Sequence, residues 1–475
     1  MKRALPLALS AFLLSCASAP QVEYPDLDLA TPANWTASTP AGGIADDWWR
    51  DLGTTRLDSL ITQALAQNYD LKGTATRLAQ AQAQAIAAGA PLLPQLSGSG
   101  NGSKRKQNFV GFPIPGSAGQ VLSSTSTSYG VNLNLSWEVD LWGRLRAGTQ
   151  AAIADAQAAE ADWAGARLSL AAQTARAYFA AVEAGRQVEL AHATVENYRV
   201  STEQIQRRYR RGLRSSLDLR LGRSSLAAAQ ATLEQRRQQQ DISLRQLELL
   251  LGRYPSASIV VGSELPAVNG AVPAGLPADL IERRPDLVAA ERRLAAADRR
   301  LVRARRALLP SISLTTSTGR SSSALSDLLD GDFSVWNLVG NISQPFLQGG
   351  RLRAGVDQAA GAAEGALFGY AQSALRAYGE VETRLSAEGF LADQEQALAT
   401  AATEATAARV LAEERYARGL SNLITLLESQ RRAFDAQSRL LSIKRQRLDA
   451  RVNLYLALGG GFNDSTPSQH AEVSQ

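Results

Sequence analysis

Few side chains in this chain of 475 residues have the types and spacing that chemistry needs. The only cysteine is Cys16, so the chain can form neither an internal disulfide nor a thiolate metal site. His192 and His470 lie far apart in the sequence, in no spacing typical of metal ligation or acid–base catalysis. We find no nucleophile–base pair, phosphate-binding glycine loop or metal cluster, and the net charge of +5 comes with no nucleic-acid-binding module. The sequence therefore predicts a protein that is not an enzyme, needs no cofactor and binds no nucleic acid.

The chain begins with features of a secreted protein. Two basic residues precede a short apolar run, so residues 1–15 are predicted to be a signal peptide. The run ends in Leu-Leu-Ser before Cys16, which resembles the lipobox of bacterial lipoproteins, where the cysteine becomes the lipidated N-terminus. An ordinary signal peptide with an incidental cysteine is the alternative. Ala17 follows instead of aspartate, and by the same resemblance the lipidated segment 16–56 is addressed to the outer membrane.

The chain contains an internal repeat. Four pairs of similar segments recur in the same order: 64–82 with 280–298, 92–94 with 308–310, 143–148 with 350–355, and 208–213 with 415–420. We therefore divide the chain into a first repeat (57–252), a linker bearing proline and glycine (253–278), a second repeat (279–458) and a C-terminal tail (459–475). The tail is expected to be flexible.

Each repeat is predicted to contain a helix, a β-hairpin and two long helices. In the first repeat, residues 57–90 keep helical spacing, and apolar residues then alternate with small polar ones over 129–137, as in a strand. The basic, proline-bearing stretch 104–120 is predicted to be the loop of the hairpin. A helical pattern then runs to a turn at Gly212, and a helix of about 65 residues would be on the order of 100 Å long. The second repeat shows the same order, with its turn at Gly419.

The predicted strands point to an oligomer. Each chain offers four strands whose alternation suits a wall between lipid and water. Backbone polar groups must be paired in lipid, and closed membrane barrels need about eight strands or more, so four strands can close only by association. Three chains would supply twelve strands, and this argument leaves dimeric and tetrameric closure open. A different possibility is a periplasmic coiled-coil adaptor or scaffold lipoprotein that has no pore.

The motifs and their order resemble the TolC/OprM family of outer-membrane efflux proteins, in its lipidated, NodT-type branch. The matching segments are the lipobox, DLWGRLRAG at 140–148, Arg-Pro-Asp-Leu at 284–287, QPFLQGGRLRAG at 344–355 and RYARGLSNLITLLESQRRAF at 415–434. The resemblance implies a homotrimer whose twelve-stranded transmembrane β-barrel continues into a periplasmic barrel of twelve helices. It also implies export of drugs or other small solutes together with a periplasmic adaptor (a membrane fusion protein) and an inner-membrane pump.

The resemblance also implies a gate at the turns between the long helices, at the periplasmic tip. Thr425 and Glu428 fall on the two acidic positions of the second turn, and only Glu428 is acidic here. Asp218 falls on an acidic position of the first turn that pairs with a tyrosine, here Tyr416. Three copies of Glu428 around one axis would form a ring that attracts cations. The alternative is that both acids are solvated charges on helix faces.

Overall fold

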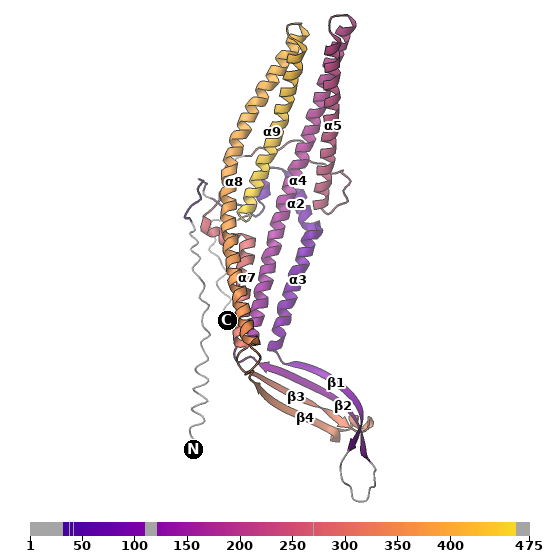
Figure 1. The fold of residues 1–475 in the computed structure, drawn as a ribbon, viewed down its shortest axis with the longest axis vertical. Helices are drawn as coiled ribbons and strands as arrows, with labels where there is room; N and C mark the ends of the chain where they lie inside the picture. The colour runs from indigo at the N-terminus through magenta and orange to yellow at the C-terminus, as the bar shows by residue number, and fades with distance from the viewer. Residues whose placement is uncertain (1–31, 38, 41, 110–120, 269, 462–475) are drawn as a thin grey trace. The chain divides into compact units, whose positions relative to one another are not determined.

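The computed structural model describes residues 32–37, 39–40, 42–109, 121–268 and 270–461. Cys16, the predicted signal peptide and the tail beyond residue 461 lie outside the described residues. The chain divides into two compact units, and each unit takes segments from both repeats. Figure 1 follows the elements in chain order.

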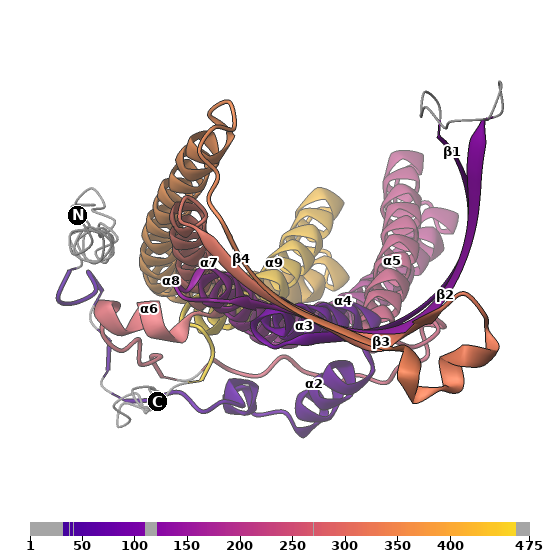
Figure 2. The ribbon, with the colours of Figure 1, turned by 90° about the horizontal axis from the view of Figure 1, so that it is seen from below.

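The first unit contains residues 79–158 and 291–369 and is built around a β-sheet. Its four antiparallel strands lie in the order β1 (Gln95–Phe109), β2 (Leu122–Val139), β3 (Ser311–Ser322) and β4 (Ser334–Ser343). Figure 2 shows that the sheet is curved along its strands. Both predicted hairpins are therefore present, and β2 pairs with β3 to join them.

The predicted loop at 104–120 is wrong in its first part, because residues 104–109 continue β1. Lys104 lies opposite Thr127 on β2, and the pairing continues to the end of the strand. The ladder of backbone hydrogen bonds outweighs the weak strand preference of lysine and arginine, whose side chains remain exposed here. Residues 110–120 lie outside the described residues.

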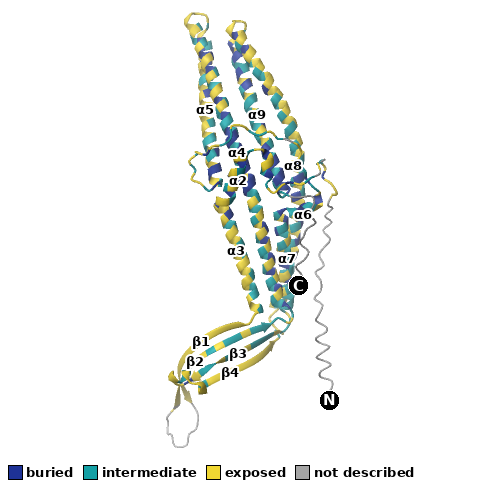
Figure 3. Cartoon of the chain, turned by 180° about the vertical axis from the view of Figure 1, so that it is seen from behind, coloured by how far each residue is buried: buried dark blue, intermediate teal, exposed yellow. Residues whose placement is uncertain are grey.

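The sheet leaves its edges and many apolar side chains uncovered within one chain. Among the described residues, strands β1 and β4 each pair on one side only. On β4, Trp336, Leu338 and Ile342 point to the same face and are 78%, 60% and 71% exposed. Figure 3 shows β1 and β4 as exposed along their length. A strand edge without partners is not viable in lipid, so the geometry of one chain supports a sheet that is completed by other chains.

The second unit, whose described residues fall within 32–78, 159–290 and 370–461, holds the main helical core. The α-helices of the described residues are α2 (Thr55–Gln67), α3 (Tyr69–Gly89), α4 (Arg144–Arg210), α5 (Ser216–Leu250), α6 (Leu280–Arg283), α7 (Pro285–Arg306), α8 (Arg351–Ala417) and α9 (Leu423–Ala457). Short 3-10 helices lie at Trp48–Leu52, Ala90–Leu92, Pro277–Asp279, Ser326–Leu329 and Gly331–Phe333. The core of this unit includes Trp48 and Tyr455, whose rings stack with their centroids 4.9 Å apart. None of the helices in the described residues is long and apolar enough to cross a membrane.

The predicted helix at 57–90 is two helices, because Asn68 interrupts it. The Asn68 side-chain oxygen accepts a hydrogen bond from the backbone N–H of Leu71 at 3.0 Å and so caps α3. Its side-chain nitrogen donates to the carbonyl oxygen of Leu250 at 3.0 Å, at the end of α5. The same side chain therefore starts one helix and fixes the end of another.

Candidate functional site at the helix turns

The two turns between the long helices pack against each other in the second unit. The turns contain Gly212 and Gly419, both in left-handed backbone conformation (φ 71° and 79°), which favours glycine. A small hydrophobic cluster joins them, and its buried members are Ile205, Leu219, Tyr416, Leu423 and Leu426. We call residues 203–223 and 411–432 the tip. Because the cluster takes residues from both repeats, the two turns of one chain form one packed tip.

Tyr416 is the buried centre of the tip. The guanidinium groups of Arg208 and Arg214 lie over its ring, 5.2 and 5.0 Å from the ring centroid, within the range of cation–π attraction. Arg208 also donates hydrogen bonds to the carbonyl oxygens of Tyr416 (3.2 Å) and Ala417 (2.8 Å), at the end of α8. Burial raises the pKa of Tyr416, and the charges of Arg214 and Arg208 offset this only in part. Arg208 thus ties the end of α4 to the end of α8.

Asp218 and Thr425 occupy equivalent positions in the first turns of α5 and α9. Ser215 caps α5, since its hydroxyl accepts a hydrogen bond from the backbone N–H of Asp218 at 3.1 Å. Asn422 caps α9 and accepts from both the backbone N–H (2.8 Å) and the hydroxyl (3.0 Å) of Thr425. The tyrosine expected to pair with Asp218 is close in the tip, but in the part of the chain that the structure describes the Tyr416 hydroxyl is buried without a hydrogen-bond partner.

Glu428 lies one turn further along α9, and its carboxylate is bound by two arginines of the next turn. Arg431 donates two hydrogen bonds to its carboxylate through one nitrogen, at 2.9 and 3.0 Å, and Arg432 donates at 2.6 Å. The hydrogen bonds from Arg431, and then those from Arg432, lower the pKa of Glu428 to about 2. The carboxylate is therefore ionised at neutral pH, but its single negative charge is bound by two positively charged side chains. A ring of Glu428 side chains would bring two arginines with each carboxylate.

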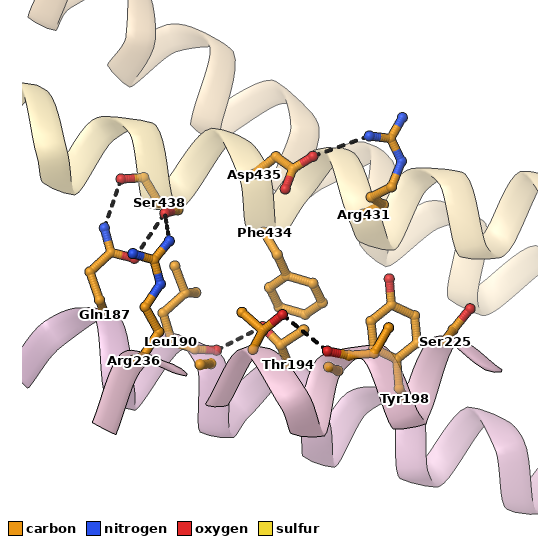
Figure 4. Close-up of a pocket in the computed structure, with 14 residues that line it drawn as sticks. Gln187, Leu190, Thr194, Tyr198, Ser225, Arg236, Arg431, Phe434, Asp435 and Ser438 are labelled. Carbon is orange, nitrogen blue, oxygen red and sulfur yellow. Dashed lines mark hydrogen bonds and ion pairs between the residues drawn. The ribbon is translucent and has the colours of Figure 1, made fainter. Parts of the chain in front are cut away.

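A cavity of about 300 Å³ lies between α4, α5 and α9, next to the tip. Figure 4 shows Phe434 of α9 pointing toward α4, where it meets the side chains of Leu190, Thr194 and Tyr198. The ring centroids of Tyr198 and Phe434 are 6.3 Å apart. The cavity is partly open to solvent, so it is a cleft between the three helices and not an enclosed void.

A charged group further along α9 connects it to α4. The side chain of Arg445 forms an ion pair with Glu183 of α4 at 3.1 Å and a second one with Asp449. The Asp449 side chain is 20% exposed, and one of its oxygens is buried without a hydrogen-bond partner in the described residues. Burial raises the pKa of Asp449 to about 6, against the charges of Arg445 and Arg176 and with a small further rise from Glu183.

Replacing Asp449 with asparagine is expected to stabilise the protein strongly at pH 8 and hardly at all at pH 4. The folded-state pKa of about 6 lies above the unfolded value of about 3.9. The folded state therefore binds the proton more tightly, so this carboxyl lowers stability above pH 6, and the loss is relieved as the pH falls from 6 to 4. Unfolding measurements on the purified protein should show a gain of at most about 3 kcal/mol at pH 8, falling to about half of that at pH 5. A variant less stable than the parent at pH 8 would contradict this reading of Asp449.

The sequence did not point to Arg208 or to the burial of Tyr416. The signal was present in the repeat, because Tyr209 and Tyr416 are equivalent residues of RYRRGL and RYARGL. Tyr209 is 42% exposed and Tyr416 is buried, however, and only the packing of the two turns distinguishes them.

Two further questions concern lipidation and metal binding. Cys16, the predicted lipidation site, lies outside the described residues. Within the described ranges, no group of three or more His, Cys, Asp or Glu side chains is arranged to hold a metal ion.

Comparison with known proteins gives matches over nearly the whole chain. The sequence model of the family described as "Outer membrane efflux protein" matches twice, over residues 60–253 and 276–460. The chain is 32% identical to the pyoverdine export outer membrane protein OpmQ of Pseudomonas putida, over 98% of both chains. It is also 32% identical to the outer membrane protein OprJ of Pseudomonas aeruginosa, over 97% of this chain and 96% of OprJ.

Solved structures agree with the sequence matches. The CmeC outer membrane channel of Campylobacter jejuni superposes with a TM-score of 0.87 at 25% identity, over 95% of this chain and 96% of CmeC. The open state of the MtrE outer membrane channel of Neisseria gonorrhoeae gives a TM-score of 0.80 at 28% identity, over 95% of this chain and all of MtrE.

These matches confirm the predicted architecture and role of the protein. The two family segments agree with the tandem repeat, and the structural neighbours share the β-barrel continued by an α-helical barrel. The predictions of an efflux channel of the outer membrane, extending into the periplasm as a homotrimer that works with an adaptor and a pump, are likewise confirmed. The chain belongs to the outer membrane efflux protein family.

Proposed function

We propose that the tip is the periplasmic gate of this efflux channel. Asp218, Tyr416 and Glu428 are the gate residues, on the turns formed at Gly212 and Gly419. The observation that supports this most directly is the pair of hydrogen bonds by which Arg208 holds the end of α8. A closure that depends on a few partly exposed polar contacts and a small hydrophobic cluster can open at low free-energy cost, as a gate requires.

The remaining parts of the chain take the roles that the sequence predicts. Residues 1–15 are a signal peptide, and segment 16–56 is anchored to lipid through Cys16. Each repeat, 57–252 and 279–458, contributes a β-hairpin to the barrel and two long helices to the tunnel, with 253–278 as the linker. The chain conducts passively and catalyses no reaction, so the free energy for export comes from the pump.

The cargo consists of small organic solutes. Relatives of this chain include a pyoverdine export protein, an antibiotic efflux pump protein and a toluene efflux pump protein. The solutes in these names differ too much in chemistry to indicate a single solute for this chain. Because one conduit serves many solutes, the choice of solute is made mainly by the pump.

The adaptor covers the exposed apolar side chains of the tip. Each turn presents two such residues at equivalent positions of the repeat: Leu213 and Leu217 in the first turn, Leu420 and Ile424 in the second. Exposed apolar groups of this kind are typical of contact surfaces between proteins.

Replacing Arg208 with glutamine is expected to open the gate. The variant loses two charge-assisted hydrogen bonds to backbone carbonyls and one cation–π contact. A loss of about 1.4 kcal/mol shifts the ratio of open to closed tips by about tenfold. In planar bilayers, the purified trimer should conduct at least about threefold more current than the parent.

Arg207 provides the matched control for this experiment. It is adjacent and exposed, and its one ion pair, with Glu203, is long at 3.9 Å. The Arg207→Gln variant removes the same charge and should conduct like the parent. Equal conductance of the parent and both variants would refute the gate. If the parent protein forms a heat-modifiable trimer that conducts no ions at all, the proposal that it is a channel is refuted. A scaffold without a pore would then be favoured.

A further inference from the structure

The tip carries a large excess of positive charge. Residues 203–223 contain seven arginines and two acidic residues, and residues 411–432 contain four arginines and three acidic residues. The net charge of the first segment is therefore +5 and that of the second is +1, so the tip of one chain carries +6. The whole 475-residue chain has a net charge of +5, which means that the rest of the molecule is close to neutral.

The acidic side chains of the second turn are already engaged within their own chain. Glu428 is held by two arginines of its own helix, as described above. Glu414 forms an ion pair with Arg418. Glu413 forms an ion pair with Arg409 at 2.9 Å and accepts a further hydrogen bond from Asn197. These acidic side chains therefore do not present uncompensated negative charge.

Several arginines of the tip, in contrast, lack an acidic partner. Arg210, Arg211 and Arg415 are exposed and form no ion pair with any residue in the described ranges. Arg208 and Arg214 lie over the neutral ring of Tyr416, and Arg208 is bonded to carbonyl oxygens, so neither cation is neutralised by a carboxylate.

We propose that the periplasmic end of the channel favours anionic over cationic solutes, an inference that rests on the proposed placement of the tip at the entrance. Three tips around one axis carry a net charge of +18. The potential of such a cluster reaches about 8 to 10 Å at physiological ionic strength, so charges on the rim act on passing solutes whether or not they touch them. The positive sign of this potential is opposite to the negative sign expected from a ring of Glu428 carboxylates.

Ion selectivity of the purified full-length trimer tests the proposal. The reversal potential in a planar bilayer, measured across a gradient of potassium chloride, gives the permeability ratio of chloride to potassium. We expect a ratio above one for the parent. The triple variant Arg210→Gln/Arg211→Gln/Arg415→Gln should lower the ratio at least about twofold, and the difference should shrink in 1 M salt, where the screening length is about 3 Å.

A second triple variant removes the same charge elsewhere on exposed helix faces. Arg77, Arg237 and Arg439 lie on α3, α5 and α9, outside the tip. The variant Arg77→Gln/Arg237→Gln/Arg439→Gln should keep the ratio of the parent. Heat-modifiable migration as a trimer on SDS gels identifies any variant that fails to assemble.

The outcomes separate this inference from the proposed function. A parent that conducts but prefers potassium overturns the anion preference and leaves the channel intact. An equal fall of the ratio in both triple variants also overturns it, because the effect would then come from total charge. A parent that assembles but does not conduct contradicts the proposed channel itself.

Discussion

Replacing Gly319 with alanine is expected to prevent assembly of the barrel. Gly319 on β3 lies directly opposite Asn132 on β2. An added Cβ atom would lie 2.8 Å from the Asn132 Cα atom and closer still to the carbonyl oxygen of Val131. Backbone atoms cannot yield as a flexible side chain does, so β2 and β3 would have to separate where the two hairpins join. We expect a cost of about 3 kcal/mol per chain, repeated in each of three chains.

The measurement is the fraction of the variant that migrates as a heat-modifiable trimer in outer-membrane extracts. Gly100→Ala on β1 provides the control, since its Cβ atom would be 3.9 Å from the Gly130 carbonyl oxygen, an ordinary contact. We expect the control to assemble like the parent and the Gly319 variant to be largely lost. Normal amounts of trimeric Gly319→Ala protein would mean that β2 and β3 are not paired as described.

The strands and long helices were predictable because they follow local rules. Alternation over 129–137 and sustained helical spacing up to Gly212 reflect the periodicities of strand and helix, and neither depends on distant residues. The prediction failed at 104–109, where pairing with β2 overrides the composition, and at Asn68, where one side chain breaks a helical pattern. The first failure comes from a tertiary contact, which a local pattern does not contain. The break at Asn68 combines a local cap on α3 with a contact to the distant Leu250.

The contacts of the tip were predictable from the sequence only where they join residues that are close together in the chain. The ion pairs of Glu428 join residues three and four positions apart on one helix, so the sequence alone could have shown that its charge is compensated. The contact of Arg208 with Tyr416 joins residues 208 positions apart. The repeat indicates that two turns exist, but it does not say which tyrosine becomes buried when they pack together.

The buried arginine of the Arg-Pro-Asp-Leu motif connects several elements of the second unit. The side chain of Arg284 is 9% exposed and binds both carboxylate oxygens of Asp286, at 2.9 and 2.7 Å. Its remaining nitrogen donates to the carboxylate of Glu380 on α8 at 2.9 Å and to the carbonyl oxygen of Ala457, at the end of α9, at 3.0 Å. One guanidinium group therefore joins the start of α7 to α8 and to α9.

Replacing Arg284 with alanine should cost about 2 to 3 kcal/mol per chain, because two half-exposed carboxylates and a carbonyl lose the same guanidinium partner. The temperature at which the SDS-resistant trimer dissociates should fall by at least about 5 °C. Arg284→Lys should give only partial recovery, since an ammonium group cannot bind both oxygens of Asp286 in a planar fork. The exposed pair of Arg237 with Glu234 supplies the control, and Arg237→Ala should change stability by no more than about 0.5 kcal/mol. If Arg284→Ala dissociated at the temperature of Arg237→Ala, the junction of α7, α8 and α9 would have to be held by apolar packing alone.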